Sequence, residues 1–549
     1  MTNKKTIKRK QINRLVILLA ALLFIGGCSR AAEGQQPESI QQEEMEMAEE
    51  DSLENNGENP ADKDQDGLQT GESEEQEDTE LLTRAPAPMI LPTSWQDNRY
   101  SDDGELLAEG SLASFEVSGD GYETVAEAIQ EWFHEEEAAF TWDMDLMEEY
   151  AKDWLIFALE EELPFVSYYS RVEYDVTRGD SSVISISRLS QDYSGGAHGL
   201  YGDFGTTFDT QTGERLSFWD LTDDREEFSE KTLDYCLKRV KEKHEDMLFA
   251  DYETTIRTVW EGEPNWYLDG AGITIVFTPY ELGPFAMGMV YITLPYQEFN
   301  DLLLEKYQIK DQAGVYVLPE GIETQVSLGE ASGEKESICL FADSTDEEAY
   351  SLQTYIFKVG ETAETVAEMD RLIRSYLLQR EDGRSFLLFY GDMASEDYVT
   401  CVYELTGGGI RKIQDGGQGA FIQKGSISTQ GFTLGIRVEA LGTYTAYADY
   451  LLDGDGSLKP KGEWYPIRQA AVLTSIKELP VVVDGQKKML SAGSRIQLIG
   501  TDGEGILRYQ MMDSVENGEI HFTRGEDGWP IYVEGVEDTE YFEDLPYVG

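Results

Sequence analysis

An acidic segment near the start of the chain limits where a hydrophobic core can form. Residues 31–80 contain 19 Asp and Glu side chains and one base, Lys63, while large apolar side chains are rare. Such a segment cannot bury enough apolar surface to offset the entropy lost on ordering, and its like charges repel one another. The sequence therefore predicts an extended, disordered linker over residues 28–92 and places the folded structure after it.

The residues before this linker have the pattern of an export signal. Six Lys and Arg side chains precede an apolar run over residues 15–25, which is short for a membrane-spanning helix. The run leads into Ile25-Gly26-Gly27-Cys28, which resembles the lipobox of bacterial lipoproteins. The resemblance implies removal of residues 1–27 as a signal peptide and acylation of Cys28, which would anchor the chain to the outer face of the cell membrane. An uncleaved signal anchor is the alternative.

The net charge of the chain restricts its partners. The sequence has 107 acidic and 43 basic side chains, and its formal charge is −64. A surface of this sign repels nucleic acid and attracts cationic proteins and peptides. We therefore expect no nucleic-acid partner.

The cysteine count restricts disulfide bonding. If Cys28 carries lipid, Cys236, Cys339 and Cys401 remain, and an odd number excludes a fully paired disulfide framework. Cys339 and Cys401 both lie in predicted strands. The sequence permits one disulfide between them and favours buried thiols.

The residues after the linker mix helical and strand patterns. Over residues 93–312, amphipathic helices at 122–137 and 226–243, with a further amphipathic stretch at 146–155, interleave with hairpins such as the one at Thr212-Gly213. Helices that interleave with hairpins predict an α+β domain with an antiparallel sheet, rather than a doubly wound parallel sheet.

The rest of the chain reads mostly as strands. Residues 313–470 predict a β-rich domain with one helix at 364–379, whose apolar residues recur at helical spacing. Over residues 471–549 the predicted strands are shorter, with turns at Asp484-Gly485 and Asp502-Gly503. This pattern favours a small β module, for which an SH3-like barrel is the expected architecture.

The residue types that commonly carry catalysis do not form a recognisable enzyme motif in this sequence. The chain has four histidines, His134, His198, His244 and His521, and none is spaced from another His or a Cys as metal ligands are. A G-x-S-x-G motif and a P-loop are both missing from the sequence. We therefore predict no catalytic residue, no metal site and no cofactor.

One segment, residues 190–204, is the strongest candidate for ligand contact. Its glycines allow positive φ angles and close approach to the backbone, its aromatic rings can stack, and its histidine can donate or accept a hydrogen bond. The alternative is a connection between two strands that the histidine holds in place. The candidate ligand-binding residues are Tyr193, Gly195, Gly196, His198, Tyr201 and Phe204. A second segment, residues 277–288, combines two prolines, two glycines and three aromatics, and core packing is its favoured interpretation.

The order of these segments resembles a known family. Helix 122–137, strands 166–189, Gly195-Gly196-Ala197-His198-Gly199, helix 226–243 and segment 277–288 follow one another in the chain. This order resembles the extracytoplasmic domain of RsiV-type anti-sigma factors and the N-terminal region of PdaC-type peptidoglycan deacetylases, and the resemblance covers residues 93–312. It implies a binding module, and RsiV-type domains bind lysozyme. Few residues precede the apolar run and the deacetylase metal motifs are missing, so anti-sigma and deacetylase activities are not expected.

These observations together favour a non-enzymatic function. We expect an extracytoplasmic binding or sensing lipoprotein whose ligand is a cell-wall glycan or a cationic wall-targeting protein such as lysozyme. An enzyme that modifies wall polymers and an accessory scaffold of an envelope complex are the alternatives.

Overall fold

A computed structural model describes residues 84–328, 335–343, 352–393, 397–407, 409–415, 419–454, 456–468, 470–542 and 544–547. The predicted signal peptide, Cys28 and most of the predicted linker lie outside these residues. Among the residues described, no helix has the length and apolar character needed to cross a membrane.

Ordered structure begins earlier than the sequence predicts. Strand β1 starts at Met89, inside the predicted linker, and Arg84 is buried. The Arg84 guanidinium pairs with Asp311 (Nε to Oδ1, 2.8 Å) and donates to the carbonyls of Ser327 and Arg380. The linker was predicted to extend to residue 92 because of its prolines. The pairing of β1 with the next strand, together with its apolar contacts, keeps these residues in a strand despite the prolines.

One long sheet connects the first two predicted domains. Eleven described strands form it, in the order β18-β17-β16-β15-β10-β3-β4-β5-β6, with β2 pairing β3 and β1 pairing β2. All its pairs are antiparallel except β2–β3, which is parallel. Its strands are β1 (Met89–Tyr100), β2 (Leu106–Ser118), β3 (Tyr168–Asp180), β4 (Val183–Tyr193), β5 (Leu200–Asp209), β6 (Arg215–Leu216), β10 (Gly314–Val317), β15 (Arg371–Gln379), β16 (Ser385–Asp392), β17 (Tyr398–Thr406) and β18 (Gly409–Asp415).

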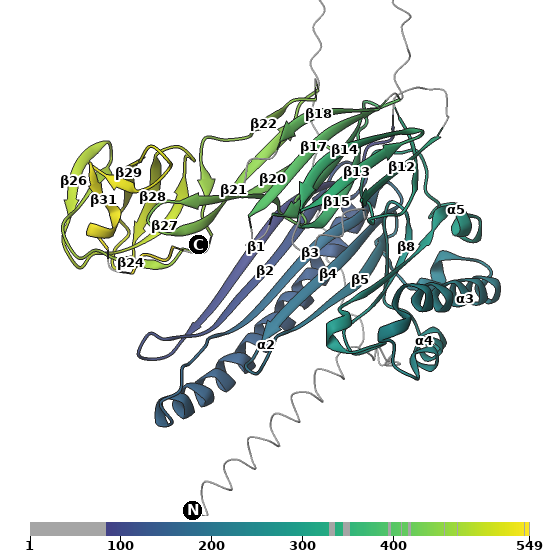
Figure 1. Ribbon diagram of the computed structural model, residues 1–549, viewed down its shortest axis with the longest axis horizontal. Helices are drawn as coiled ribbons and strands as arrows, with labels where there is room; N and C mark the ends of the chain where they lie inside the picture. Colours follow the sequence, from purple (N-terminus) through teal and green to yellow (C-terminus); the bar gives the residue numbers. More distant parts are fainter. Residues whose placement is uncertain are drawn as a thin grey trace, which may run out of the picture. The chain divides into compact units, whose positions relative to one another are not determined.

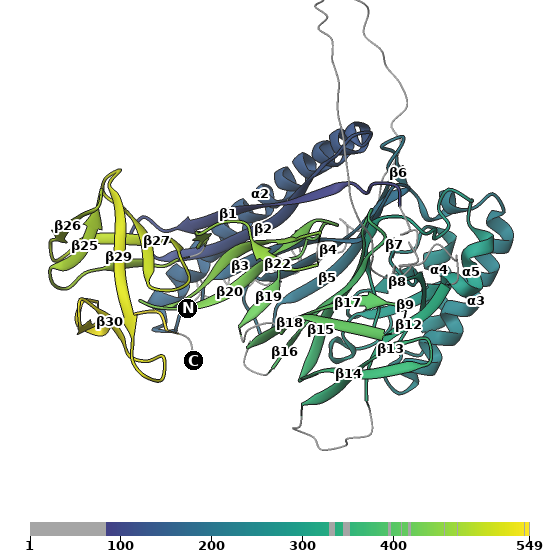
Figure 2. The ribbon, with the colours of Figure 1, turned by 90° about the horizontal axis from the view of Figure 1, so that it is seen from above.

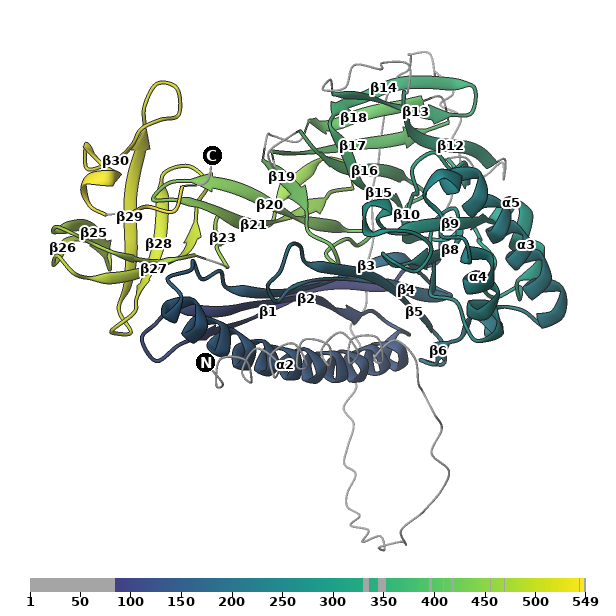
Figure 3. The same ribbon diagram turned by 60° about the horizontal axis from the view of Figure 1, so that its bottom comes forward.

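Helix α2 (Glu123–Glu160) makes the crossover between the parallel strands β2 and β3 (Figures 1 and 3). The two amphipathic stretches predicted at 122–137 and 146–155 form this single helix, because no Pro or Gly interrupts the sequence between them. Its buried face packs on one side of the sheet. The shared core includes Val125, Ile129, Phe133, Val172, Tyr174, Ile184, Ile186 and Phe208.

A small three-stranded sheet lies beside β4 and β5, with helices on its outer side (Figure 2). Its elements are α3 (Arg225–His244), α4 (Tyr252–Glu261), β7 (Trp266–Leu268), β8 (Gly272–Phe277), β9 (Val290–Pro295) and α5 (Tyr296–Phe299). The predicted helix 226–243 is confirmed as α3. Asp224 caps its first turn by accepting from the Glu227 N–H. Short 3₁₀ turns occur at Phe218–Leu221, Glu245–Met247, Phe285–Met287, Asn300–Leu302 and Asp538–Glu540.

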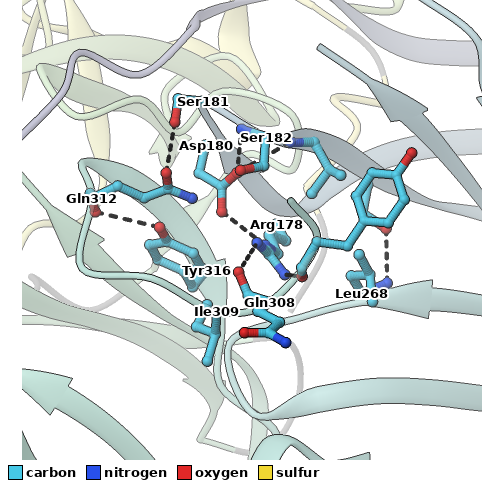
Figure 4. A network of polar contacts seen from close by, with 12 residues as sticks. Arg178, Asp180, Ser181, Ser182, Leu268, Gln308, Ile309, Gln312 and Tyr316 are labelled. Carbon is cyan, nitrogen blue, oxygen red and sulfur yellow. Dashed lines mark hydrogen bonds and ion pairs between the residues drawn. The ribbon is translucent and has the colours of Figure 1, made fainter. Parts of the chain in front are cut away.

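A buried arginine fixes the connection into β10 (Figure 4). Arg178 pairs with Asp180 (Nε to Oδ2, 2.7 Å), and both side chains are fully buried. Its other nitrogens donate to the Tyr296 hydroxyl at 2.8 Å and to the Tyr307 carbonyl at 2.9 Å. The segment that leads into β10 is thereby held against the end of β3, and the long sheet runs without a break past residue 312.

The helix predicted at 364–379 is wrong. Residues Thr362–Met369 form β14, and Arg371–Gln379 form β15. β14 pairs β13, while β15 lies between β10 and β16 in the long sheet. One four-stranded sheet contains β11 (Thr324–Ser327), β12 (Lys335–Ala342), β13 (Gln353–Val359) and β14. Another four-stranded sheet contains β19 (Ala420–Ile422), β20 (Gly431–Glu439), β21 (Thr443–Leu452) and β22 (Leu458–Pro460).

The C-terminal module consists of strands, as predicted, but no closed barrel is found in its described residues. Its main path, β23-β27-β28-β29-β25-β26, begins at β23 and ends at β26, and in the described residues these two strands do not pair to close the sheet. Strands β24, β30 and β31 pair off this path. Its strands are β23 (Tyr465–Pro466), β24 (Val472–Thr474), β25 (Leu479–Val483), β26 (Gln486–Leu490), β27 (Arg495–Thr501), β28 (Ile506–Met511), β29 (Asn517–Arg524), β30 (Ile531–Val533) and β31 (Val536–Glu537). The predicted fold class is confirmed: an α+β N-terminal region precedes a mostly-strand region.

Candidate functional site

The predicted ligand-binding segment forms the end of the β4–β5 hairpin and the turn between the two strands. Gly195 and Gly196 lie in this turn with φ angles of +91° and +100°, a region that favours glycine. A Cβ atom on Gly195 would lie 3.3 Å from the Tyr168 hydroxyl. The two glycines therefore shape the turn, and their backbone conformation presents the following His198 at the surface.

His198 brings together two segments that are distant in the sequence. Its ring stacks on Phe285, with the centroids 4.0 Å apart and the planes at 20°. Tyr201 packs edge-on against the same ring at 5.3 Å, and the exposed Tyr280 lies 5.7 Å from it. Phe285 belongs to segment 277–288, for which core packing was predicted. Phe277 and Leu282 of that segment are buried in the core, whereas Phe285 is half-buried between other surface aromatics.

Tyr193 forms a second stacked pair near the same hairpin end. Its ring stacks on Tyr169 of β3 at 5.7 Å with an interplanar angle of 24°. The Arg171 guanidinium lies over the Tyr169 ring, 4.9 Å from its centroid. The Tyr193 hydroxyl donates to the Gly196 carbonyl at 3.3 Å. The pair is half-buried, so part of each ring faces solvent.

Strand register places these rings on one face of the long sheet. Tyr169 pairs with Tyr193, and Gln191 pairs with Tyr201, so the three tyrosines point to the same side. Since α2 packs against the residues of opposite parity, this face is the one away from the helix. We call this set the aromatic strip: Tyr169, Tyr193, His198, Tyr201, Tyr280 and Phe285.

Phe204 does not join the aromatic strip. It pairs with Arg188 in the β4–β5 ladder and points to the α2 side, where the Arg188 guanidinium lies 6.0 Å from its ring. Arg188 also pairs with Glu136 of α2 at 2.8 Å. Side chains along β5 alternate between the two faces of the sheet, so Phe204 and Tyr201 point to opposite faces. This alternation can be read from the sequence.

A polar cluster adjoins the aromatic strip on the same face. Asp203, two residues after Tyr201, accepts from Ser187 at 2.6 Å and from the Tyr291 hydroxyl at 3.2 Å. Further along the sheet, Asp175 accepts from Arg374 Nε at 2.8 Å and from the Tyr376 hydroxyl at 3.0 Å. We call Asp175, Asp203, Tyr291, Arg374 and Tyr376 the polar cluster. Of these residues only Asp203 lies in a segment that the sequence singled out.

The electrostatics of the polar cluster keep its phenols protonated and its guanidinium charged. Burial, and then the charge of Asp203, raise the pKa of Tyr291 far above its usual value. Burial and Asp175 do the same to the pKa of Tyr376. Although burial lowers the pKa of Arg374, the charges of Asp175 and Asp203 raise it well above the ordinary value. At neutral pH the cluster therefore holds hydroxyl and guanidinium donors beside carboxylate acceptors. Asp175, Asp203 and Tyr376 are buried, so Tyr291 is the member of the cluster that is exposed to solvent.

A further ion pair extends this face. Lys424 Nζ lies 2.9 Å from Glu173 Oε2, and although burial lowers the pKa of Lys424, the charge of Glu173 raises it above the ordinary value. The charges around the site are thus paired within the protein.

The other histidines lie elsewhere: His134 on α2, His244 at the end of α3 and His521 on β29. In the part of the chain that the structure describes, no group of three or more His, Cys, Asp or Glu side chains could hold a metal ion. Cys236, Cys339 and Cys401 are buried and none of them forms a disulfide, so the Cys339–Cys401 bond that the sequence permitted is not present.

Residues 220–297 match a family model described as a protein of unknown function, DUF3298. This segment contains α3, α4, the three-stranded sheet and Phe285. Residues 220–297 thus carry a DUF3298 domain, which lies inside the region for which the family resemblance was predicted.

Two solved structures of DUF3298-family proteins are similar to the chain. One, from Bacteroides fragilis NCTC 9343, is 19% identical, covers 41% of this chain and 96% of its own, and gives a TM-score of 0.33. The other, from Pseudomonas aeruginosa PAO1, is 13% identical, covers 41% of this chain and 98% of its own, and gives a TM-score of 0.29. No curated protein matches the chain.

Proposed function

We propose that this chain is a non-enzymatic, extracytoplasmic binding lipoprotein whose ligand is a cell-wall glycan. The observation that carries the proposal is the aromatic strip, in which His198 and Phe285 stack beside Tyr201 at the surface. The RsiV-type and PdaC-type resemblance of residues 93–312 supports the same class of binding module.

The chemistry of the site fits a sugar polymer. A sugar ring has an apolar C–H face and a rim of hydroxyls. Half-exposed aromatic rings offer apolar surface for the first, and a few fixed polar groups give orientation to the second. Tyr291, which is 37% exposed, lies where the aromatic strip meets the polar cluster and is bonded to Asp203. A chain of sugars laid along the strip would therefore meet the aromatic rings and, at Tyr291, a hydroxyl whose orientation the buried Asp203 fixes.

Calorimetric titration of the full chain with N-acetylglucosamine oligomers and with muropeptides tests this function. We expect saturable binding that weakens about tenfold in Phe285→Ala, because stacked aromatic contacts contribute about 0.5–1.5 kcal/mol beyond their buried area. Phe204→Ala is the matched control, since this ring lies on the other face of the same hairpin. An absence of binding to both ligands, or equal loss in the two variants, would refute the proposal.

A cationic wall-targeting protein such as lysozyme is the second candidate ligand. The net charge of −64 favours it, and removal of residues 1–27 would make the charge −70 because six bases are lost. Opposite charge speeds association and makes it sensitive to salt. Titration with lysozyme at low and high salt tests this candidate, and binding that does not change with salt would count against it.

The location is part of the same proposal. Acylation of Cys28 would hold the folded region outside the membrane, with the acidic segment as a spacer. We expect Cys28→Ala to move the protein from the membrane fraction to the soluble fraction. Mass spectrometry of native protein that found a bare thiol at Cys28, or residues 1–27 still attached, would disprove the anchor.

A further inference from the structure

The C-terminal end of α2 is apolar on every side. Six apolar residues follow one another there, Trp154-Leu155-Ile156-Phe157-Ala158-Leu159. Successive residues in a helix point about 100° apart, so a run of six surrounds the helix axis completely. A helix that is apolar all round is typical of one that is covered on all sides.

The rest of the fold covers only one side of this run. Ala158 is 1% exposed, and Leu155 packs partly against the core beneath the sheet. Phe157 is half-buried. Five large side chains of this run and of the segment after it are exposed. Their exposed fractions are 36% for Trp154, 59% for Ile156, 72% for Leu159, 46% for Leu163 and 55% for Val166. We call these five residues the apolar tip.

The apolar tip is held in one arrangement. The helix ends as the Leu163 N–H donates to the Ala158 carbonyl at 2.9 Å, which folds the chain back over the last turn. Trp154 lies against Phe157, with ring centroids 5.3 Å apart. The end of the helix and the Trp154 ring are thereby fixed, so this surface needs little ordering before it binds.

The charges next to the apolar tip in the sequence are mostly acidic. Asp153, Glu160, Glu161 and Glu162 are exposed and flank the apolar run, and the one base beside it, Lys152, is ion-paired with Glu148. A second copy of this chain would bring the same charges, as would an anionic lipid surface or the acidic residues 31–80. Repulsion disfavours all three, and charge complementarity favours a partner that combines apolar and basic residues.

We propose that the apolar tip docks a cationic amphipathic segment, in which an apolar stripe is flanked by Lys or Arg. The stripe would cover Ile156 and Leu159, and the basic residues would face the glutamates at the helix end. Segments of this kind bind as helices laid on an apolar surface. Ile156 and Leu159 lie on α2, and the strand residues of the aromatic strip point to the opposite face of the sheet, so this inference does not rest on the glycan proposal. The proposed segment and lysozyme, the second candidate ligand, have only their positive charge in common.

Fluorescence anisotropy with a labelled synthetic helix of Leu and Lys tests the inference on the full chain. We expect saturable binding that weakens at least tenfold in the double variant Ile156→Ser/Leu159→Ser, with a parallel change in Trp fluorescence. The matched control is Ile476→Ser/Met489→Ser, which removes two side chains of similar exposure, 48% and 55%, in the C-terminal module. The urea midpoint of each variant shows whether it is folded.

Four outcomes would overturn the inference. They are tight binding by the tip variant, equal loss in the control variant, equal binding of a Leu and Gln helix without charge, and capture of anionic vesicles in preference to the peptide. Sedimentation tests a fifth outcome. If the wild-type chain forms a dimer and the tip variant is a monomer, the surface binds a second copy of the chain and not the peptide. Lysozyme binding that survives in the tip variant, together with loss of the peptide, would support the inference and place lysozyme at another surface.

Discussion

The ring of His198 stacks on the ring of Phe285, and this contact ties the β4–β5 turn to the loop that precedes β9. The turn belongs to the long sheet, while the loop belongs to the DUF3298 domain. The proposed glycan surface is therefore assembled from two parts of the chain, and neither part carries it alone.

A double-mutant cycle on His198→Ala and Phe285→Ala should show coupling between the two rings. Stacked pairs contribute about 0.5–1.5 kcal/mol beyond area burial, so we expect a coupling free energy of unfolding near the lower end for this partly exposed pair. Urea unfolding measures it. His521→Ala, which removes an exposed histidine on β29, should show no coupling to Phe285.

Arg178→Met should be among the most destabilising single substitutions. It leaves the Asp180 carboxylate buried without its partner, and such losses cost about 3–5 kcal/mol in the free energy of unfolding. Arg239→Met is the control, because Arg239 pairs with Glu242 at the surface of α3 and such pairs contribute about 0.3–0.5 kcal/mol. A similar shift of the urea midpoint in both variants would contradict the role given to Arg178.

Asp143→Asn should stabilise the protein at neutral pH but not in acid. Burial and the charge of Asp192 raise the pKa of Asp143 from 3.8 to about 6 in the folded chain. Because the folded pKa is the higher one, this carboxyl favours the folded state below its unfolded pKa, and that contribution is lost as pH rises through about 6. Asp143 is partly exposed, so we expect a gain of only about 1–2 kcal/mol for the variant near neutral pH.

Urea unfolding of wild type and Asp143→Asn at acid and neutral pH measures this difference. Glu149→Gln, an exposed change on the same helix, should leave the two curves parallel. A constant difference between wild type and Asp143→Asn at all pH values would contradict the prediction.

The three buried thiols should react only when the chain unfolds. Burial raises the pKa of Cys339 to about 11, and burial alone raises that of Cys236 still further. The thiol is a poor nucleophile when its thiolate is disfavoured. A thiol reagent should therefore modify the folded region slowly, and it should modify Cys236, Cys339 and Cys401 rapidly after denaturation. An unfolding midpoint that drops on addition of a reductant would indicate a disulfide instead.

Local patterns predicted the elements whose character is carried by neighbours in sequence. Helix α3 has an N-cap Asp224 and apolar residues at helical spacing, so its bounds were nearly correct. Hairpin β5–β6 has Thr212-Gly213 at its turn, and Gly213 adopts a φ of +71°. In each case the signal lies within a few residues and needs no contact from elsewhere.

The helix expected at 364–379 shows where such patterns mislead. Val366, Met369 and Leu377 are at helical spacing, but all three are also buried on strands β14 and β15. Pairing of β14 with β13, and of β15 with β10 and β16, satisfies the backbone and buries these side chains between sheets. Long-range pairing, which no local window contains, decided between helix and strand.

The same division holds for the protein as a whole. The sequence by itself determined the acidic segment, the lipobox-like Cys28, the excess of negative charge and the α+β character of the first folded region, because these depend on composition and local spacing. Only the tertiary structure decided that Tyr201, His198 and Phe285 meet while Phe204 faces α2, and that Arg374 lies beside Asp175. Those relationships depend on strand register and on contacts between residues far apart in the chain, and neither is encoded in any short stretch of sequence.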